Sequence, residues 1–205
     1  MCGRFTITMS AGEIQTLLEE NFNASVDFIA TKPRYNIAPT METLALLYDG
    51  KKYRVGMIPW GFRFERNQKP ILAFNTRIET IEEKPFFKTL YDANRIAFLS
   101  NGYFEWDTTD KTPYWMHYQD QAPMFLGGIW RKDKTYQGSI ITLNAPENLA
   151  RIHPRVPFSM PLKSVGSWLK EGTQNPLSLF QTPNEIKPIS KAVNKVSNND
   201  ALILE

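Results

Sequence analysis

The only cysteine of the chain stands at position 2, in the sequence Met1-Cys2-Gly3-Arg4. Removal of Met1 would give Cys2 a free α-amine beside its thiol. Such a 1,2-aminothiol condenses with an aldehyde to an imine, and the thiol then closes a five-membered thiazolidine ring. An α-amine titrates near ~7.7–8.0 and a free thiol near ~8.5, so both nucleophiles exist in part at neutral pH. Cys2 therefore indicates a covalent site for a carbonyl compound, and the alternative is a frayed terminal residue without function.

Polar side chains that could serve such a site follow the short apolar run at 71–74. Asn75, Arg77 and Glu79 come directly after it and supply an amide, a guanidinium and a carboxylate. Polar groups at the end of a strand are a common way for a sheet to present a site. The alternative is a solvated turn in which Arg77 and Glu79 form an ion pair.

A carboxylate in an aromatic setting follows in Tyr103-Phe104-Glu105-Trp106. Strand alternation puts Tyr103 and Glu105 on one face and the other two residues on the opposite face. Partial burial would raise the pKa of Glu105 towards the range useful for proton transfer. The competing interpretation is a glutamate on an edge strand, in water.

An imidazole with a fixed backbone occurs in Ile152-His153-Pro154-Arg155-Val156-Pro157. Two prolines hold this segment, and histidine is the side chain best suited to exchange protons near neutrality. Arg155 is a candidate phosphate ligand. The other histidine, His117, lies in an apolar strand, and we expect it to be structural.

Trp60 stands between a proline and a glycine and must either fill the core or project from a rigid turn. Isolated tryptophans are mostly buried. However, Arg63, Arg66 and Lys69 follow closely, and exposed aromatic rings beside cations are typical of surfaces that bind single-stranded nucleic acid.

The elements that must position these residues are mostly strands. An Asp49-Gly50 turn between apolar runs at 43–48 and 51–57 predicts a hairpin, and the two prolines of 33–40 favour a loop or an edge strand. Further strands are predicted at the positions 95–100, 103–106, 113–118, 123–130 and 138–143.

Short helices are predicted to cover this sheet. The sequence from Ser10 to Glu13 has the spacing of a capping box and starts a helix over 11–21. A second helix opens at 84–87, a third covers 163–169, and 188–194 closes the sheet as a last strand. We therefore expect an α+β fold, with a distorted, barrel-like, mostly antiparallel sheet in one domain over 1–205.

Composition limits the class of function. The net charge is +3, which is small for a protein that wraps nucleic acid non-specifically. One cysteine and two histidines make a zinc site improbable, and we expect neither a metal nor a cofactor. No window is long and apolar enough for a membrane span and no signal peptide is evident, so we expect a cytoplasmic protein, which acts as a monomer.

Nine blocks of the chain, in order, resemble the SOS-response-associated peptidase (SRAP) family, whose members crosslink to abasic sites in DNA. They are Met1-Cys2-Gly3-Arg4-Phe5, Tyr35-Asn36-Ile37-Ala38-Pro39-Thr40, Ile58-Pro59-Trp60-Gly61, Asn75-Thr76-Arg77-Ile78-Glu79-Thr80, Asn101-Gly102-Tyr103-Phe104-Glu105-Trp106, Gly128-Ile129-Trp130, Ile141-Thr142-Leu143-Asn144-Ala145, His153-Pro154-Arg155-Val156-Pro157 and Pro188-Ile189-Ser190. Asn-Thr-Arg stands where Asn-Ala-Arg is common, and Arg-Val-Pro replaces Arg-Met-Pro. Pro154 directly after His153 is also less usual in the family.

The resemblance implies a positively charged groove for single-stranded DNA, or for junctions of single and double strands, and association with the nucleoid during DNA damage. It makes Cys2 the linkage residue after Met1 removal. Asn75 would orient the amine and the sugar, Glu105 would shuttle protons, and His153 would assist ring opening and reversal. The implied DNA contacts are the phosphate clamps Arg4, Arg77 and Arg155, the base wedge of Pro39 and Trp60, and the pocket residue Thr142.

Two other classes of function stay open. Glutamine amidotransferases of one class also begin Met-Cys-Gly and use the thiol to attack an amide, although Arg4-Phe5 differs from the apolar continuation expected there. A peptidase, in its minimal form the self-removal of Met1, and a lyase-like activity are variants of the covalent hypothesis. The remaining alternative is a module that binds single-stranded DNA without chemistry.

Overall fold

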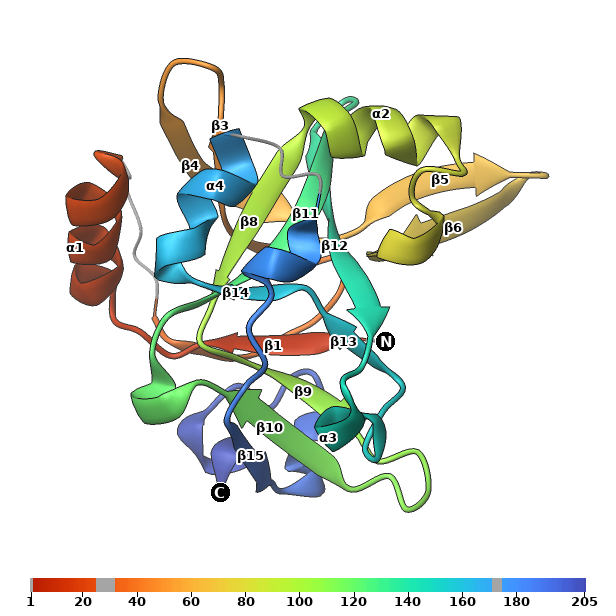
Figure 1. The fold of residues 1–205 in the computed structure, drawn as a ribbon. Helices are drawn as coiled ribbons and strands as arrows, with labels where there is room; N and C mark the ends of the chain where they lie inside the picture. The colour runs from red at the N-terminus through yellow and green to blue at the C-terminus, as the bar shows by residue number, and fades with distance from the viewer. Residues whose placement is uncertain (1, 25–31, 171–174) are drawn as a thin grey trace.

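The computed structural model describes residues 2–24, 32–170 and 175–205, which are drawn in colour in Figure 1. A five-stranded antiparallel sheet, in the lower half of Figure 1, has the order β15-β10-β9-β1-β2. Its strands are β1 (Arg4–Ile7), β2 (Arg34–Ile37), β9 (Gly102–Trp106), β10 (Pro113–His117) and β15 (Glu185–Pro188). β2 is an edge strand, which confirms the expectation from its flanking prolines.

An eight-stranded sheet lies above it in Figure 1, with the main order β13-β12-β11-β8-β3-β4. Its strands are β3 (Glu42–Tyr48), β4 (Tyr53–Pro59), β7 (Asn75–Arg77), β8 (Arg95–Ser100), β11 (Met124–Lys132), β12 (Tyr136–Asn144), β13 (Arg155–Pro157) and β14 (Ser159–Pro161). The hairpin predicted around Asp49-Gly50 is confirmed by the pairing of β3 with β4. β7 joins the sheet by parallel pairing with β12, which carries Asn75 and Arg77 beside β13.

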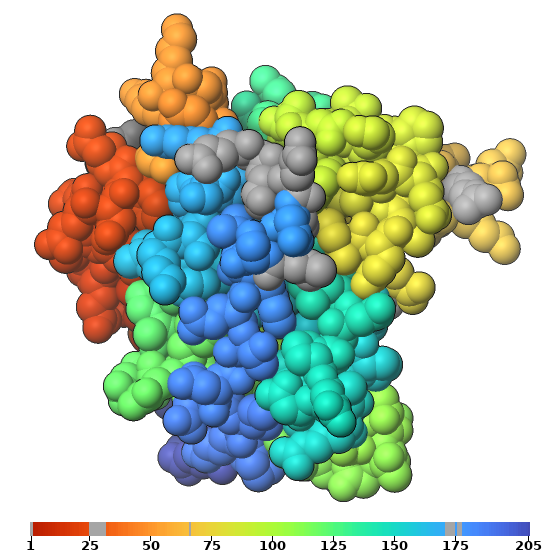
Figure 2. Space-filling model, in the orientation of Figure 1, coloured from red at the N-terminus to blue at the C-terminus, as the bar shows by residue number. Residues whose placement is uncertain are grey.

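The hairpin of β5 (Phe62–Arg66) and β6 (Lys69–Ala73) forms a separate two-stranded unit. It projects beyond the body of the molecule next to α2 (Pro85–Ala93), as Figures 1 and 2 both show. Pro85 occupies the first turn of α2, as predicted for the helix that opens there.

The main core lies between the two larger sheets. Phe5 of β1 faces Tyr103 of β9, and both side chains are fully buried in the main hydrophobic cluster. Phe104 belongs to a second, smaller cluster on the outer face of the five-stranded sheet. The alternation predicted for 103–106 is therefore confirmed, and it aims Glu105 at the inside of the protein.

α1 (Ala11–Phe22) begins with the capping box predicted from Ser10 and Glu13, in which each side chain bonds the backbone of the other residue. Its buried face ends in Phe22, whose ring packs 5.1 Å from that of Tyr53. The remaining α-helices are α3 (Glu147–Ala150) and α4 (Val165–Lys170), and α4 lies within the covering helix predicted at 163–169 except for its last residue. The 3-10 helices η1 (Ile78–Thr80), η2 (Gln119–Gln121), η3 (Leu162–Ser164) and η4 (Pro176–Leu179) lie in the connections between strands and α-helices or between strands.

The predicted closing strand at 188–194 is wrong in its position. β15 ends at Pro188, which lacks the N–H needed to continue the ladder. Ser190 then caps the 3-10 helix η5 (Lys191–Asn194), and η6 (Ala201–Leu204) follows. These turns cover the outer hydrophobic cluster of Phe104, Trp115, Ile189, Val193 and Ile203.

The prediction of an α+β fold with a distorted, mostly antiparallel sheet is confirmed, although the two larger sheets are open and do not close into one barrel. Among the described residues, no helix is long and apolar enough to cross a membrane.

Candidate functional site

Cys2 lies two residues before β1 and is completely buried. The side-chain amide of Asn75 donates a 2.8 Å hydrogen bond to the Cys2 carbonyl, which ties the residue to β7. The Cys2 thiol lies 3.8 Å from the carbonyl of Arg4. Burial raises the pKa of the thiol well above its usual range, and the nearby Glu105 carboxyl raises that pKa further. The sequence-based estimate for a free thiol is therefore too low, because it ignored burial.

Asn75 also presents an acceptor. Its side-chain oxygen is buried and has no hydrogen-bond partner among the described residues. Leaving a buried acceptor unmet costs ~1–3 kcal/mol, so evolution keeps such a group mainly where it serves a ligand or a reaction. Since the same amide holds the backbone of Cys2, this oxygen lies close to the Cys2 main chain.

Glu105 is only 2% exposed, in line with the expectation from its aromatic neighbours. Burial raises its pKa to about 8. The carboxyl group therefore keeps its proton at neutral pH and serves as an acid there. Its neighbour Tyr103 is fully buried, with a hydroxyl that has no partner among the described residues. Burial and the Glu105 charge raise the pKa of Tyr103 well above its usual value, so this phenol is neutral.

His153 approaches Glu105 from the segment before β13. Its Nδ1 lies 3.8 Å from Oε2 of Glu105, and the His153 side chain is 20% exposed. Burial lowers the pKa of His153 from its ordinary value and raises that of Glu105, so the ring is neutral at pH 7 while Glu105 keeps its proton. The His153 Nδ1 lies 2.9 Å from the Arg155 carbonyl and 3.0 Å from the Arg155 N–H, and the tautomer decides whether it donates to the first or accepts from the second.

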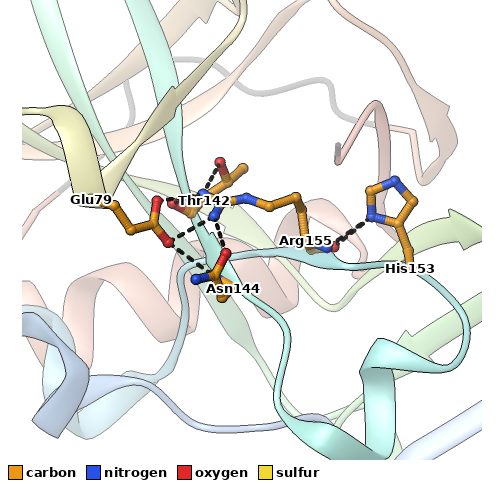
Figure 3. A network of polar contacts seen from close by, with 5 residues as sticks. All are labelled: Glu79, Thr142, Asn144, His153 and Arg155. Atoms are coloured by element: carbon orange, nitrogen blue, oxygen red, sulfur yellow. Dashed lines mark hydrogen bonds and ion pairs between the residues drawn. The ribbon is translucent and has the colours of Figure 1, made fainter.

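Arg155 is held by protein groups (Figure 3). Its guanidinium forms a bidentate ion pair with Glu79, at 2.7 and 2.9 Å, and donates to the Asn144 side chain at 2.6 Å. It also donates to the carbonyl and hydroxyl oxygens of Thr142, at 2.7 and 3.2 Å. With a side chain only 12% exposed, Arg155 fixes the start of β13, directly after the segment that bears His153.

Arg77 is the exposed guanidinium beside these residues. No ion pair or hydrogen bond from its side chain is found within the part of the chain that the structure describes. The Arg–Glu pair considered for this turn forms instead between Glu79 and Arg155, which leaves Arg77 available. Arg77 lines a pocket of about 180 Å³ with Asn75, Thr76, Thr80, Ile81, Lys84 and Phe87.

Comparison with known proteins finds a family model and relatives that match the chain. The family model described as SOS response associated peptidase (SRAP) matches residues 1–196. The chain is 28% identical to the abasic site processing protein YoaM of Bacillus subtilis, over 100% of this chain and 98% of that protein. It is also 28% identical to the abasic site processing protein YedK of Escherichia coli, over 100% and 99%.

The chain belongs to the SRAP family.

The fold is also found in a solved structure of a protein from Bacteroides thetaiotaomicron, with a TM-score of 0.79. That protein is 20% identical to this chain, and the match covers 100% of this chain and 99% of the other.

Three residues predicted to contact DNA are buried or paired inside this SRAP chain, and their DNA contacts stay predictions. Trp60 is fully buried, its indole N–H donates a 2.8 Å hydrogen bond to the Phe74 carbonyl, and its ring packs 5.1 Å from Phe5. The indole is therefore not exposed as a base wedge in this structure. Thr142 is likewise fully buried and serves Arg155. Arg155 itself is neutralised by Glu79 and so is not a free phosphate clamp.

Arg4 and Pro39 keep partial access in this SRAP fold. The Arg4 guanidinium donates to Asn36 and to the Val193 carbonyl, both at 2.8 Å, and to the Asn194 carbonyl at 3.3 Å. Arg4 thus ties β1 to the C-terminal turns. Pro39 is half-buried in the turn after β2. Direct DNA contacts by either residue stay predictions.

Sequence reasoning did not single out Glu79 as the partner of Arg155, the neutral phenol of Tyr103, or Asn36. Asn36 is 2% exposed and its side chain donates to the carbonyls of Val193, Lys195 and Asn198. Its place in the Tyr35–Thr40 block was a signal of importance, but nothing local named partners 157 residues or more away in the chain.

Proposed function

We propose that the protein processes abasic sites in single-stranded DNA by forming a covalent crosslink through Cys2 after removal of Met1. The observation that carries the proposal is the sole cysteine at position 2, held by Asn75 beside a carboxyl group that is protonated at neutral pH. The relatives of the chain that are named abasic site processing proteins support the same substrate. An abasic deoxyribose opens to an aldehyde, which is the electrophile that a 1,2-aminothiol captures.

The amine of Cys2 reacts first in this proposal. Its lone pair attacks C1′ of the open-chain aldehyde to give a carbinolamine. Glu105 gives its proton to the carbinolamine hydroxyl, which departs as water and leaves an iminium ion. The high pKa of the buried thiol favours this order, because little thiolate exists until the sugar is bound.

The thiol then closes the ring. The Glu105 carboxylate formed in the previous step accepts the thiol proton, and the sulfur adds to the iminium carbon to give a thiazolidine. The balance is one aldehyde plus one aminothiol giving one thiazolidine and one water, with the Glu105 proton returned. Glu105 therefore acts as acid and then as base within one turnover.

Asn75 and His153 assist in this scheme. The unmet side-chain oxygen of Asn75 accepts a hydrogen bond from the Cys2 amine and so directs its lone pair at C1′. The neutral, partly exposed ring of His153 would form a hydrogen bond with the sugar hydroxyl that is freed when the deoxyribose ring opens. The same contact would return the proton during reversal.

The DNA strand would reach Cys2 along Arg77. The exposed Arg77 guanidinium suits a backbone phosphate, whereas the guanidinium of Arg155 is already paired. A single strand fits the proposal because the sugar must swing into a buried site, which base pairing and stacking oppose. Action at junctions of single and double strands belongs to the same proposal, as does action as a monomer.

An amidohydrolase of the N-terminal nucleophile type is less well supported. Such an enzyme starts with attack by the thiolate, and burial disfavours that form of Cys2. A peptidase activity, as the family description suggests, would act on Met1 in its minimal form. Incubation of protein that retains Met1 tests this. Self-processing would lower the intact mass of the protein, with time, by the mass of one methionine residue. A lyase-like step, cleavage of the DNA strand at the crosslinked sugar, would appear as a shortened oligonucleotide.

Crosslinking to an abasic oligonucleotide tests the proposal. The wild-type protein should give an adduct that survives heat and denaturant, and Cys2→Ala should give none while it still binds DNA in a salt-sensitive manner. A denaturation-stable adduct with Cys2→Ala would show that the linkage lies elsewhere. Formation of the adduct by Glu105→Ala at the wild-type rate would remove Glu105 from the proton-transfer role.

A further inference from the structure

The burial of Trp60 leaves the aromatic part of a single-strand surface to another residue. Phe86, near the first turn of α2, is 44% exposed. Large aromatic rings that stay this exposed beside cations are typical of sites that stack nucleobases. Ile71 of β6 is another exposed apolar side chain, at 41%.

The Phe86 ring is held by an aromatic cluster. It packs edge-on against Phe64 at 5.4 Å, Phe87 at 5.2 Å and Phe62 at 6.3 Å. The Arg131 guanidinium lies 4.4 Å from the Phe64 ring and 5.9 Å from the Phe86 ring, and Gln137 holds it by a 3.0 Å hydrogen bond. A ring fixed in this way loses little conformational freedom when a ligand stacks on it.

Ile71 extends the same platform. It is paired across the hairpin with Phe64, and paired residues lie on one face of a two-stranded sheet. Lys69, two residues earlier on β6, shares that face and is exposed. Arg63 and Glu65 point to the opposite face, so the platform face of the hairpin carries a cation and no described acidic group.

The platform is continuous with the reactive site. The 180 Å³ pocket runs from Asn75, which holds Cys2, to Lys84 and Phe87, and the ring of Phe87 contacts Phe86. Arg77 and Lys84 line the connection, and the Lys84 ammonium lies 6.0 Å from the Phe87 ring.

We infer that Phe86, extended by Ile71, is a stacking platform for an unpaired nucleobase next to the abasic site. The inference rests on the proposed function. A nucleobase is the occupant because the ring is flat and fixed, because the cations Arg77, Lys84 and Lys69 complement backbone phosphates, and because the platform adjoins the pocket at Asn75. A chain that binds there leaves its base-free sugar facing Cys2.

The test compares two oligonucleotides with one abasic site each, one flanked by normal nucleotides and one by abasic-like spacers that have phosphates but no bases. The Kd is measured in the Cys2→Ala background, in which no covalent adduct forms. Phe86→Ala should raise the Kd for the base-flanked strand by roughly 5- to 100-fold, the range for loss of one aromatic stacking contact, and leave the spacer-flanked strand within about twofold. Phe86→Trp should restore tight binding. Leu202→Ala, an exposed apolar residue of η6, is the matched control and should change neither Kd.

A fluorescent base reports the contact directly. When 2-aminopurine replaces the base beside the abasic site, its emission should change on binding to wild-type protein and to Phe86→Trp, and not on binding to Phe86→Ala. The platform would be overturned if Phe86→Ala weakened binding of both oligonucleotides equally. It would also be overturned if the 2-aminopurine emission changed as much on binding to Phe86→Ala as on binding to the wild type. Failure of the proposed function is distinct, since the wild-type protein would then form no stable adduct with either strand.

Discussion

Glu105 carries the proton that the proposed reaction needs, because burial holds its pKa at about 8. The proton is not lost to His153, whose pKa is lowered by burial, although Nδ1 lies only 3.8 Å away. Two groups with pKa values pushed apart in this way take different roles. Glu105 serves as the acid, and His153 as a neutral hydrogen-bonding group.

This pKa predicts the pH dependence of crosslinking. The rate should rise from pH 6 towards pH ~8 as the Cys2 amine loses its proton, and fall above that pH as Glu105 ionises. Glu105→Gln cannot donate a proton, so its rate should be at least ~10-fold lower at pH 7 and should not fall at high pH. Single-turnover rates on an abasic oligonucleotide at several pH values measure both profiles. A wild-type rate that keeps rising to pH 9.5 would contradict the acid role.

The same group predicts a pH dependence of stability. The ordinary pKa of the carboxyl is 4.5 and the folded pKa is about 8, so the folded state binds the proton more tightly. The stability from this group is complete below pH 4.5 and is lost as the pH rises through about 8. The free energy of unfolding should fall between pH 5 and pH 9 by on the order of 2–4 kcal/mol more in the wild type than in Glu105→Gln. Urea titrations of both proteins at the two pH values test this. An equal change in the free energy of unfolding in both proteins would mean that Glu105 is solvated in the folded state.

Single residues can be chosen from sequence where the signal is local. Cys2, Asn75 and Glu105 are marked by a terminal position, a strand end and an aromatic alternation. The burial of Trp60 and the pairing of Arg155 could not be predicted, because their partners Phe5 and Glu79 are distant in the chain. The sequence alone does not show whether the guanidinium of an arginine binds a phosphate or a carboxylate.

At the scale of elements, the contact of β12, β13 and η1 gives Arg155 and Arg77 different surroundings, since it pairs the first and leaves the second exposed. Glu79 of η1 neutralises Arg155 of β13, and Thr142 and Asn144 of β12 complete its hydrogen bonds. Burial by itself would raise the pKa of Glu79, but the Arg155 hydrogen bonds lower it overall. The ion pair therefore contributes stability above the ordinary pKa of 4.5 and loses it in acid.

Substitutions on these elements should therefore have different effects on DNA binding. Arg77→Gln removes a phosphate contact, so the slope of log K against log salt should fall by ~0.7, the value for one phosphate of a single strand. Glu79→Gln should leave that slope unchanged and lower stability by ~1–3 kcal/mol, because Arg155 loses its charged partner. Salt titrations of binding to an oligonucleotide, with thermal unfolding alongside, give both quantities. A reduced slope for Arg155→Gln but not for Arg77→Gln would reverse the assignment.

Elements with a strong local signal were predicted well. The capping box at Ser10, the Asp49-Gly50 turn and the proline at the start of α2 each mark the boundary that the structure has. The closing strand was predicted too late in the chain, because a short apolar pattern is the same in a strand and in a turn. In the structure, Pro188 ends the strand and Ser190 caps a 3-10 helix.

For the whole molecule, the C-terminal turns are fastened to the five-stranded sheet by Asn36 and Arg4. The Asn36 side chain bonds three backbone carbonyls between Val193 and Asn198 and accepts from Arg4. Figure 2 shows the last residues, in blue, packed against the lower part of the molecule. The sequence predicted the sheet class, but which strands pair across long separations, and that the sheets stay open, depends on contacts no local pattern contains.

Asn36→Ala should destabilise the entire protein, because it removes the donor to the Val193, Lys195 and Asn198 carbonyls and one of the acceptors of Arg4. We expect a loss of ~2–4 kcal/mol in the free energy of unfolding, with a single cooperative transition. Asn21→Ala, on the outer side of α1, is a matched control and should cost well under ~1 kcal/mol. Chemical denaturation followed by circular dichroism measures both. A separate early transition would mean that the C-terminal turns fold independently of the sheet.

The central claim is that Cys2 captures the abasic aldehyde with both its amine and its thiol. Intact-mass spectrometry after mixing the Met1-processed protein with an abasic oligonucleotide tests it most directly. We predict one adduct, heavier than the protein by the oligonucleotide minus one water, which forms without a reductant and resists iodoacetamide under denaturing conditions because the only thiol is consumed. Protein that retains Met1 should form no such adduct. An adduct whose cysteine still reacts with iodoacetamide, or one of equal yield with Cys2→Ala, would contradict the account.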